Sequence, residues 1–256
     1  MRYVRLQMFN DKLELRSGEL KHLEVMRKRF PLKTKGLYQN SLYDIVILGN
    51  GRLQQVDFVA DVLPGRCCFW IPLFDKSRME WAVEKLTELG ASLLVFYYSD
   101  HCTYNKMQIN KFAKPEKLKR IENKIWAAAQ QSGNFCPPKI AGVFSLKELQ
   151  NDHFLGRATI WSVHAEEVIK PSSISCINEV SESSITTHGL MAKNLKHFVI
   201  GPEGDFSLAE RELLSNLVWG RMNTNLILRT ETALIVTASQ LGREWRSSVT
   251  NIRGNL

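Results

Sequence analysis

The stretch Val199-Ile200-Gly201-Pro202-Glu203-Gly204-Asp205-Phe206-Ser207 decides how this chain is interpreted, because it joins a strand, a glycine turn and a helix start. Residues 196–200 predict a short buried strand, and the glycines and proline after it predict a tight turn that a flat ligand could approach closely. Ser207 and Glu210 have the spacing of a capping box, which predicts a helix from Leu208 to Trp219 that stops at Gly220. This order of elements indicates a ligand pocket at the turn.

A second element further along the chain has the same design. The apolar run Leu226-Ile227-Leu228 predicts a strand, and Arg229-Thr230 forms its polar end. The residues from Glu231 to about Trp245 predict a helix with Thr and Glu in its first turn. Since a polar turn follows each of the two strands, we expect the turns to converge on one site.

The first 66 residues are predicted to form a small β-rich domain. Apolar runs at Leu42–Leu48 and Leu53–Val59 predict strands, and Asn50-Gly51 between them is a strong hairpin signal.

The pattern changes at Cys67, where strands and helices begin to alternate, and residues 67–256 are predicted to form an α/β domain. The predicted elements are a strand at Cys67–Phe74, a helix at Arg78–Leu89 ending at Gly90, strands at Ser92–Tyr98 and Ala158–Val163, and a helix from Pro115 to about Gln131. This alternation favours a parallel sheet with helices on both faces. The Ser-rich residues 171–194 are predicted to be a mobile insertion.

The composition suits a basic two-domain protein. The chain has 256 residues, of which 44% are hydrophobic, and a formal net charge of +8. The sequence pI of 9.3 favours a polyanionic partner such as RNA.

The cysteines favour neither a metal site nor a disulfide framework. The five residues form no C-x-x-C pair and no Cys/His spacing of a zinc site, and adjacent Cys67-Cys68 is most simply a pair of small apolar residues in a strand. No signal peptide and no membrane-length apolar run is present, so we expect a soluble, cytoplasmic protein with reduced thiols and no metal.

The two motifs closely resemble the last two motifs of the RsmE-type methyltransferases of the SPOUT superfamily. Further similar segments are Lys76-Ser77-Arg78-Met79-Glu80, Thr87-Glu88-Leu89-Gly90-Ala91, Gln131-Ser132 with Pro137 or Pro138, and His22-Leu23-Glu24-Val25-Met26-Arg27. The resemblance implies a SPOUT-type α/β domain with a trefoil knot, preceded by a PUA-like barrel. It also implies a homodimer that uses S-adenosylmethionine to methylate N3 of a uridine in 16S rRNA of the small ribosomal subunit.

Some positions depart from the family pattern. Asp205 stands where the family usually has a second Gly, and Asn134 where it usually has Arg. Gln130 replaces an expected acid, and Asn223-Thr224 replaces a Leu-Gly pair. If the usual Gly at 205 has a positive φ, an aspartate there requires either the same conformation or a different turn.

The expected cofactor-binding residues are Ser162, Val163, His164, Val199, Ile200, Gly201, Pro202, Glu203, Gly204, Leu226, Leu228, Arg229, Thr230 and Ala233. Arg229 is the first candidate for stabilising a developing uridine anion, although a salt bridge to Glu203 or Glu231 would also explain it. Glu203 either orients the ribose or pocket backbone, or simply caps a helix. His164 is a possible base, but a lone histidine at a strand end is more often a surface residue.

RNA contacts are expected mainly in the N-terminal domain, where residues 1–65 hold eleven Lys/Arg against seven Asp/Glu. The candidates are Arg2, Arg5, His22, Arg27 and Arg29. A second basic segment, 106–124, holds seven cations against two acids, and this is either an RNA surface or a solvated helix face.

Two other functions stay open. One is a different SPOUT activity on tRNA or rRNA, such as ribose 2′-O or guanine N1 methylation. The other is a noncatalytic RNA-binding protein of ribosome assembly, which the departures at Asp205 and Asn134 would favour.

Overall fold

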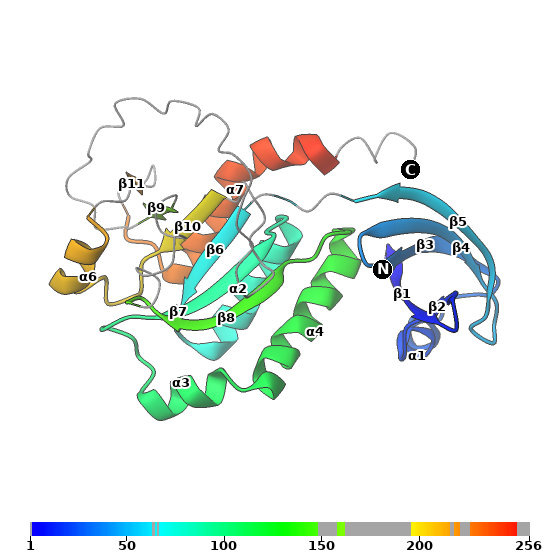
Figure 1. Cartoon of the computed structure of the whole chain (residues 1–256), viewed down its shortest axis with the longest axis horizontal. Coiled ribbons are helices and arrows are strands. Elements are labelled where there is room, and N and C mark those ends of the chain that lie inside the picture. Colours follow the sequence, from blue (N-terminus) through cyan, green and yellow to red (C-terminus); the bar gives the residue numbers. More distant parts are fainter. Residues whose placement is uncertain are drawn as a thin grey trace.

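The computed structural model describes residues 2–62, 65, 67–147, 158–161, 196–215, 218–220 and 226–249. Two β-sheets organise these residues and lie at opposite ends of the molecule (Figure 1). Several sequence predictions fall outside the described residues, at 162–164, 171–194 and 223–224. Among the helices that the structure describes, none has the length and apolar character needed to cross a membrane.

The N-terminal sheet is mixed and has the strand order β2-β1-β3-β4-β5. Its elements are β1 (Tyr3–Phe9), β2 (Lys12–Leu15), α1 (Glu19–Val25), β3 (Leu32–Tyr38), β4 (Ser41–Ile47) and β5 (Leu53–Asp61). Strands β1 and β3 pair in parallel, whereas the other neighbours are antiparallel. Gly51 has a φ of 80° in the turn between β4 and β5, which confirms the hairpin predicted from Asn50-Gly51.

The second sheet has the order β11-β9-β10-β6-β7-β8, and all its neighbouring strands pair in parallel. Its strands are β6 (Cys67–Pro72), β7 (Leu93–Tyr98), β8 (Lys139–Ser145), β9 (Ala158–Trp161), β10 (Lys196–Ile200) and β11 (Val218–Gly220). The helices are α2 (Lys76–Glu88), α3 (Lys106–Phe112), α4 (Pro115–Ser132), α6 (Leu208–Leu213) and α7 (Thr230–Val249). The predicted parallel α/β architecture is confirmed.

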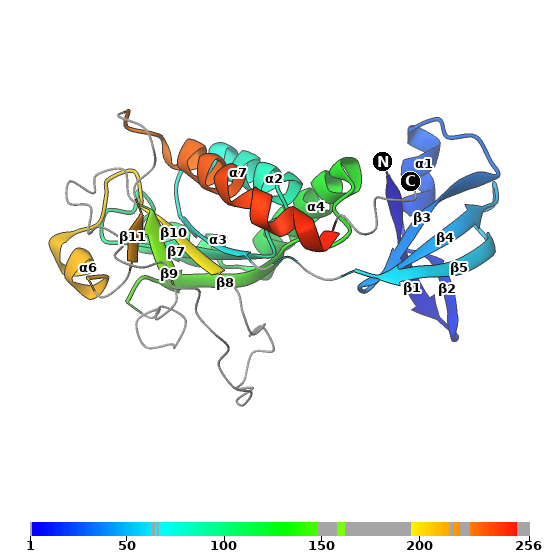
Figure 2. The ribbon, with the colours of Figure 1, turned by 90° about the horizontal axis from the view of Figure 1, so that it is seen from above.

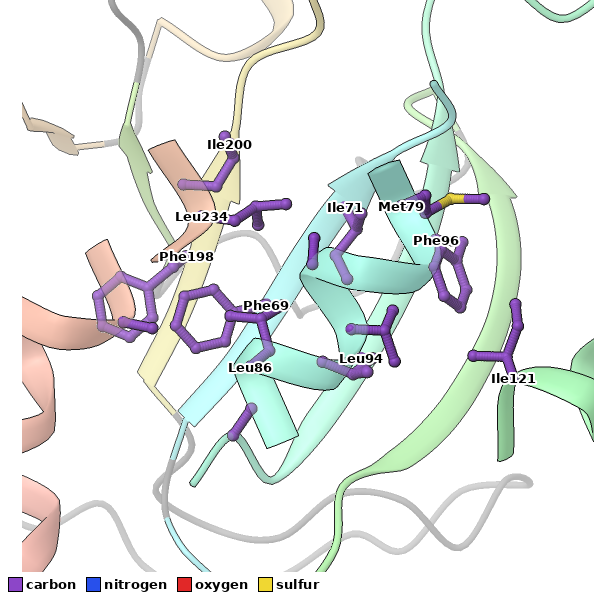
Figure 3. Close-up of a cluster of buried hydrophobic side chains, with 14 of the residues drawn as sticks. Phe69, Ile71, Met79, Leu86, Leu94, Phe96, Ile121, Phe198, Ile200 and Leu234 are labelled. Atoms are coloured by element: carbon purple, nitrogen blue, oxygen red, sulfur yellow. The ribbon is translucent and has the colours of Figure 1, made fainter. Parts of the chain in front are cut away.

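The main hydrophobic core lies between this sheet and helices α2, α4 and α7, and Phe112 of α3 joins it. Helices α7, α2 and α4 lie side by side on one face of the sheet, with α2 in the middle (Figure 2). Phe69, Leu94 and Phe198 of the strands pack there against Leu86 of α2 and Leu234 of α7 (Figure 3). The opposite face buries a second cluster that includes residues from the turn after β10 and the end of α6. Burial on both faces explains why the central strands are almost wholly apolar.

Two predicted elements are wrong. The helix that begins after Ser207 ends at Leu213, and residues 218–220 form strand β11 instead of helix. Ser215-Asn216 interrupts the helical pattern with turn-forming residues, and β-favouring Val218-Trp219 then pairs with β9.

The strand predicted at 226–228 is also absent, because those residues are irregular up to the start of α7. Leu226 is 72% exposed and Ile227 is 74% exposed. An apolar run forms a strand only where it pairs with a neighbouring strand, and residues 226–228 pair with no strand of either described sheet.

The N-terminal sheet packs on the end of α4 through a shared apolar cluster. Tyr3, Leu37 and Leu42 of the sheet are buried together with Ala129 and Phe135. This contact joins the N-terminal sheet to α4, which packs in turn on the second sheet.

Polar residues complete the junction. The amide of buried Gln130 donates to Glu19 Oε2 over 2.9 Å, and the Tyr3 hydroxyl donates to the Asn134 carbonyl over 2.9 Å. Asn134 Nδ2 donates in turn to the Thr87 carbonyl over 2.8 Å. The family departures at 130 and 134 therefore have structural roles at this junction.

Candidate functional site at the carboxyl edge of the parallel sheet

The carboxyl ends of β6, β7 and β10 meet at one edge of the sheet because these strands are parallel neighbours. The loops after them, at 73–75, 99–105 and 201–207, are therefore brought together at this edge. Ligands of open α/β sheets bind at such edges.

The glycine turn after β10 keeps a left-handed residue at position 205. Asp205 has a φ of 57°, and its backbone N–H donates to the Pro202 carbonyl over 2.9 Å. Its carboxylate accepts a hydrogen bond from the Phe206 backbone N–H over 2.7 Å and binds Arg211 Nη2 at 2.6 Å. Aspartate is among the few non-glycine residues that adopt this conformation readily. An aspartate is thus accommodated in the left-handed conformation at this position.

His101, from the loop after β7, holds this turn in place. Its Nδ1 lies 2.9 Å from the carbonyl oxygens of both Gly204 and Asp205, so Nδ1 carries the proton and donates to both. The hydrogen bond to the Asp205 carbonyl, followed by that to the Gly204 carbonyl, is the main cause of a pKa of His101 above its ordinary value. A Cβ at position 204 would lie 2.9 Å from His101 Cβ, so Gly204 is required by the close approach of this loop.

Further hydrogen bonds connect the end of β7 to the same turn. The backbone N–H of Asp100 donates to Glu210 Oε1 over 2.8 Å, and the Ser207 hydroxyl donates to Asp100 Oδ2 over 2.7 Å. The buried hydroxyl of Tyr97 donates to the Ile200 carbonyl over 2.5 Å. The predicted capping box of Ser207 and Glu210 is confirmed.

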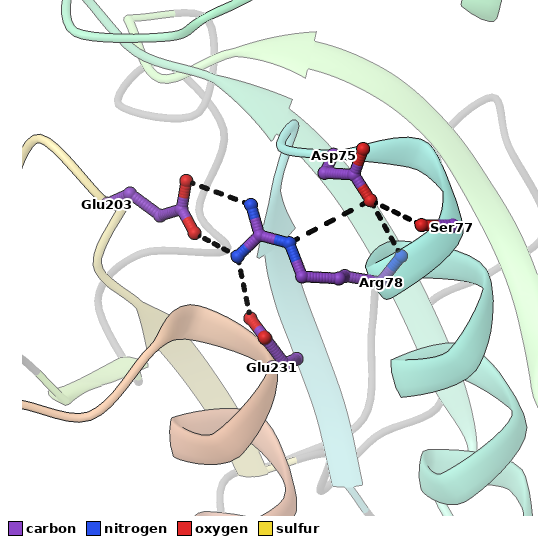
Figure 4. Close-up of polar contacts among 5 residues, drawn as sticks. All are labelled: Asp75, Ser77, Arg78, Glu203 and Glu231. Atoms are coloured by element: carbon purple, nitrogen blue, oxygen red, sulfur yellow. Dashed lines mark hydrogen bonds and ion pairs between the residues drawn. The ribbon is translucent and has the colours of Figure 1, made fainter.

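Arg78 joins the two sequence motifs to each other. From the first turn of α2, its guanidinium contacts both carboxylate oxygens of Glu203 and lies 3.3 Å from Glu231 Oε2 (Figure 4). The hydrogen bond with Glu203 is the main cause of a raised pKa of Arg78. Asp75 caps α2 by accepting from the Arg78 backbone N–H over 3.0 Å, and the guanidinium lies over the Phe74 ring at 5.7 Å. The two motifs therefore converge as predicted, and Arg78 of α2 connects them by contacting Glu203 of the first and Glu231 of the second.

The second motif forms the start of α7. Thr230 and Ala233 are buried, whereas the Arg229 side chain is exposed, and the Arg229 carbonyl accepts from the Ala233 N–H over 2.9 Å. Among the described residues, no carboxylate forms an ion pair with Arg229, so the considered salt bridge to Glu203 or Glu231 is made by Arg78 instead. Leu228 packs against the main core.

The remaining cofactor candidates divide into two sets. Val199, Ile200 and Pro202 are buried, while Gly201 is partly exposed at the turn. Ser162, Val163 and His164 lie outside the described residues. Where the chain is described, no three His, Cys, Asp or Glu side chains gather to hold a metal ion.

The candidate RNA residues of the N-terminal region lie in different surroundings. Arg5 forms an ion pair with the buried Glu19 at 2.6 Å, and its guanidinium lies over the Trp126 ring at 5.4 Å. The Arg2 side chain lies next to Gly133. His22, Arg27 and Arg29 are exposed. Arg2 and Arg5 are thus close to the junction between the sheets, and the other three face solvent.

Sequence reasoning missed Arg78 and His101 as site residues. Each follows a buried strand of the predicted parallel sheet, Arg78 after β6 and His101 after β7. A polar side chain just beyond such a strand was the signal that would have identified both.

Comparisons with known proteins agree with this architecture. A family model described as an RNA methyltransferase domain matches residues 63–242. A search of curated proteins finds no match.

Similar solved structures cover nearly the whole chain. A ribosomal RNA small subunit methyltransferase E from Neisseria gonorrhoeae, bound to S-adenosyl methionine, is 18% identical with a TM-score of 0.67 and coverage of 96% of this chain and 98% of that one. A probable rRNA-methyltransferase from Porphyromonas gingivalis is 22% identical, with a TM-score of 0.63 and coverage of 91% and 94%. A predicted RNA methyltransferase from Thermotoga maritima is 17% identical, with a TM-score of 0.62 and coverage of 97% and 100%. At these identities the likeness shows a shared fold.

Proposed function

Because this chain belongs to the RNA methyltransferase domain family, we propose that it transfers a methyl group from S-adenosylmethionine to N3 of a uridine in 16S rRNA of the small ribosomal subunit. The match to residues 63–242 carries this proposal, and it agrees with the resemblance to RsmE-type enzymes found in the sequence motifs. The basic charge of the chain suits an RNA substrate.

The proposed cofactor site is the edge where the glycine turn meets the start of α7. The turn at 201–204 presents backbone groups with little side-chain obstruction, and Arg78 ties it to Glu231 of α7. The Neisseria gonorrhoeae structure of the same fold was solved with S-adenosyl methionine bound. When bound, S-adenosylmethionine would supply a methyl group on a sulfonium sulfur. In-line attack by the nucleophile on the methyl carbon would release S-adenosylhomocysteine. We assign its binding to residues 199–204, 228–230 and 233, with 162–164 and 226 as further wall residues.

The protein residues then have to orient the uridine and favour loss of its N3 proton. Uridine N3 is a poor nucleophile while protonated, so a cation beside the base lowers the barrier by stabilising the developing anion. Arg229 suits this role because its side chain is exposed at the site and forms no ion pair with the described residues. Glu203 suits an orienting role, since Arg78 already contacts both its carboxylate oxygens.

The family resemblance extends the proposal to the whole protein. We propose a trefoil knot in the C-terminal domain, a PUA-like N-terminal RNA-binding domain over residues 1–66 and a cytoplasmic homodimer. Exposed Leu226 and Ile227, immediately before α7, provide apolar surface for such a dimer.

The test combines methyl transfer with cofactor binding. Purified protein should transfer labelled methyl groups from S-adenosylmethionine to small ribosomal subunits that lack the modification, and nuclease digestion with mass analysis should locate the label on uridine N3. In calorimetric titration, Gly204→Trp should abolish S-adenosylmethionine binding, because position 204 lies against His101. Gly49→Trp, at an exposed glycine after β4, is the matched control and should bind normally.

The alternatives predict other results. A product methylated at a ribose 2′-O or at guanine N1 would replace the uridine assignment. Retained RNA affinity without S-adenosylmethionine binding would identify a noncatalytic RNA-binding protein. The accommodation of Asp205 in its left-handed turn removes one reason for preferring this last reading.

A further inference from the structure

A buried carboxylate gathers three cations between α2 and α4. The Glu80 side chain is 9% exposed, and its oxygens lie 3.3 Å from Arg120 Nε, 3.2 Å from Lys124 Nζ and 3.9 Å from Lys76 Nζ. We name Lys76, Glu80, Arg120 and Lys124 the α2–α4 cluster. Its net charge is +2, because three cations share one anion.

This cluster holds more positive charge than a structural ion pair needs. One cation would neutralise the Glu80 carboxylate, and the two extra cations repel each other at short range. All three cationic side chains are between two-fifths and three-fifths exposed, so solvent or a solute can reach them. A bound anion would relieve the repulsion, and a phosphodiester offers charged oxygens to both a planar guanidinium and the lysine ammonium groups.

The cluster lies next to the proposed active site. Helix α2 lies between α4 and α7 (Figure 2), and residues two positions apart on a helix point to nearly opposite sides. Glu80 contacts α4, while Arg78 contacts Glu231 of α7, so about one helix diameter, roughly 10 Å, separates the cluster from the site.

A further cation extends the cluster along α4. Lys117, Arg120 and Lys124 are spaced three and four residues apart and therefore share one helix face. In the part of the chain that the structure describes, Lys117 forms no ion pair.

We propose that the α2–α4 cluster binds the RNA phosphate backbone beside the nucleotide that is methylated. The proposal rests on the proposed function, and it extends the substrate contacts beyond the N-terminal sheet. Lys76, Arg120 and Lys124 bind phosphate oxygens directly, and Glu80 offsets part of the repulsion among these cations when no RNA is bound.

The test measures RNA affinity by fluorescence anisotropy of a labelled single-stranded RNA of mixed sequence, about 16 nucleotides long. Arg120→Gln and Lys124→Gln should each weaken binding about tenfold, the loss of one charge-assisted contact. Each should also lower the slope of log affinity against log salt by about 0.7, the value for one contact to single-stranded nucleic acid. Lys119→Gln is the matched control, because Lys119 is an exposed cation of the same helix that pairs with Glu122.

Glu80→Gln separates phosphate binding from a purely structural role. This change removes the anion and keeps the three cations, so RNA should bind at least as tightly as to the wild type. Three results would each overturn the proposal. The first is an equal loss of affinity in Arg120→Gln, Lys124→Gln and the control Lys119→Gln. The others are weaker RNA binding by Glu80→Gln and no RNA binding by the wild type.

Calorimetry with S-adenosylmethionine on the same proteins distinguishes this proposal from the proposed function. The cluster variants should bind S-adenosylmethionine like the wild type. If the wild type binds RNA but no S-adenosylmethionine, the methyltransferase proposal fails while the anisotropy result still decides the role of the cluster.

Discussion

Arg78 and Glu203 form a two-point ion pair that fastens the first turn of α2 to the glycine turn after β10. The same guanidinium reaches Glu231 at the start of α7. One side chain therefore contacts three segments that are far apart in the sequence.

Arg78→Gln should weaken S-adenosylmethionine binding about tenfold, because the two turns lose their common partner. Arg78→Lys should recover only part of the affinity, since an ammonium group cannot contact both carboxylates with the geometry of a guanidinium. Calorimetric titration measures both. Lys85→Gln is the control, because Lys85 of the same helix also contacts two carboxylates, those of Glu84 and Glu88. Equal affinities for the two glutamine variants would contradict the role given to Arg78.

Gly204→Ala should lower the free energy of unfolding by about 1–3 kcal/mol, as expected for an added group without space. The clash is with His101 Cβ, so Gly204→Ala combined with His101→Gly should cost less than the sum of the single changes. Denaturant unfolding of the wild type, the two single variants and the double variant gives the coupling free energy between positions 101 and 204. Gly49→Ala meets nothing closer than Phe30 Cβ at 3.9 Å and should be nearly neutral. Additive effects of the two changes would show that the clash is not with His101.

His101 should make the stability of the turn depend on pH. Its pKa is raised in the folded protein by hydrogen bonds to the carbonyls of Asp205 and Gly204, so folding favours the protonated ring. This contribution is complete below the unfolded pKa of about 6.5 and is lost as the pH rises through the folded pKa. The Tm difference between wild type and His101→Gln should therefore be larger near about pH 5.5 than near about pH 8.5. A Tm difference for His101→Gln that stays constant over this pH range would refute the expectation.

Glu19→Ala should destabilise the junction between the sheets. The change removes the partner of both Arg5 and buried Gln130, and because Arg5 is partly solvated we expect a loss of about 2 kcal/mol in the free energy of unfolding. Asp44→Ala breaks the ion pair with Lys35 at 2.8 Å, where the carboxylate is exposed, and should cost less than about 1 kcal/mol. Denaturant unfolding measures both changes. If Glu19→Ala and Asp44→Ala lower the free energy of unfolding by similar amounts, the Glu19 contacts stabilise the protein no more than an exposed ion pair does.

Much of the fold was accessible from local sequence signals. The strand at 196–200, the helix opened by Pro115 and the capping box of Ser207 all follow from patterns within a few residues. The errors at 208–219 and 226–228 arose where strand formation depends on pairing with a distant strand, and that is a property of the whole sheet.

The candidate site was predicted as two converging motifs, but not the residues that hold them together. Arg78 and His101 act across large sequence separations, and no spacing rule connects them to Glu203 or Gly204. The sequence alone leaves the backbone conformation at Asp205 open. The φ of 57° in the structure shows that it is left-handed.

The apolar cluster that Tyr3 shares with Ala129 also bears on how an RNA would be selected. Because moving the N-terminal sheet relative to α4 would expose this cluster to water, the distance between the sheet and the carboxyl edge is constant in the folded chain. An RNA that contacts both regions must already have a shape that spans this distance. If the RNA contacts both regions, as proposed, the fixed distance would add affinity for RNA held in a matching tertiary structure, as in an assembled particle, beyond the affinity for a flexible free strand.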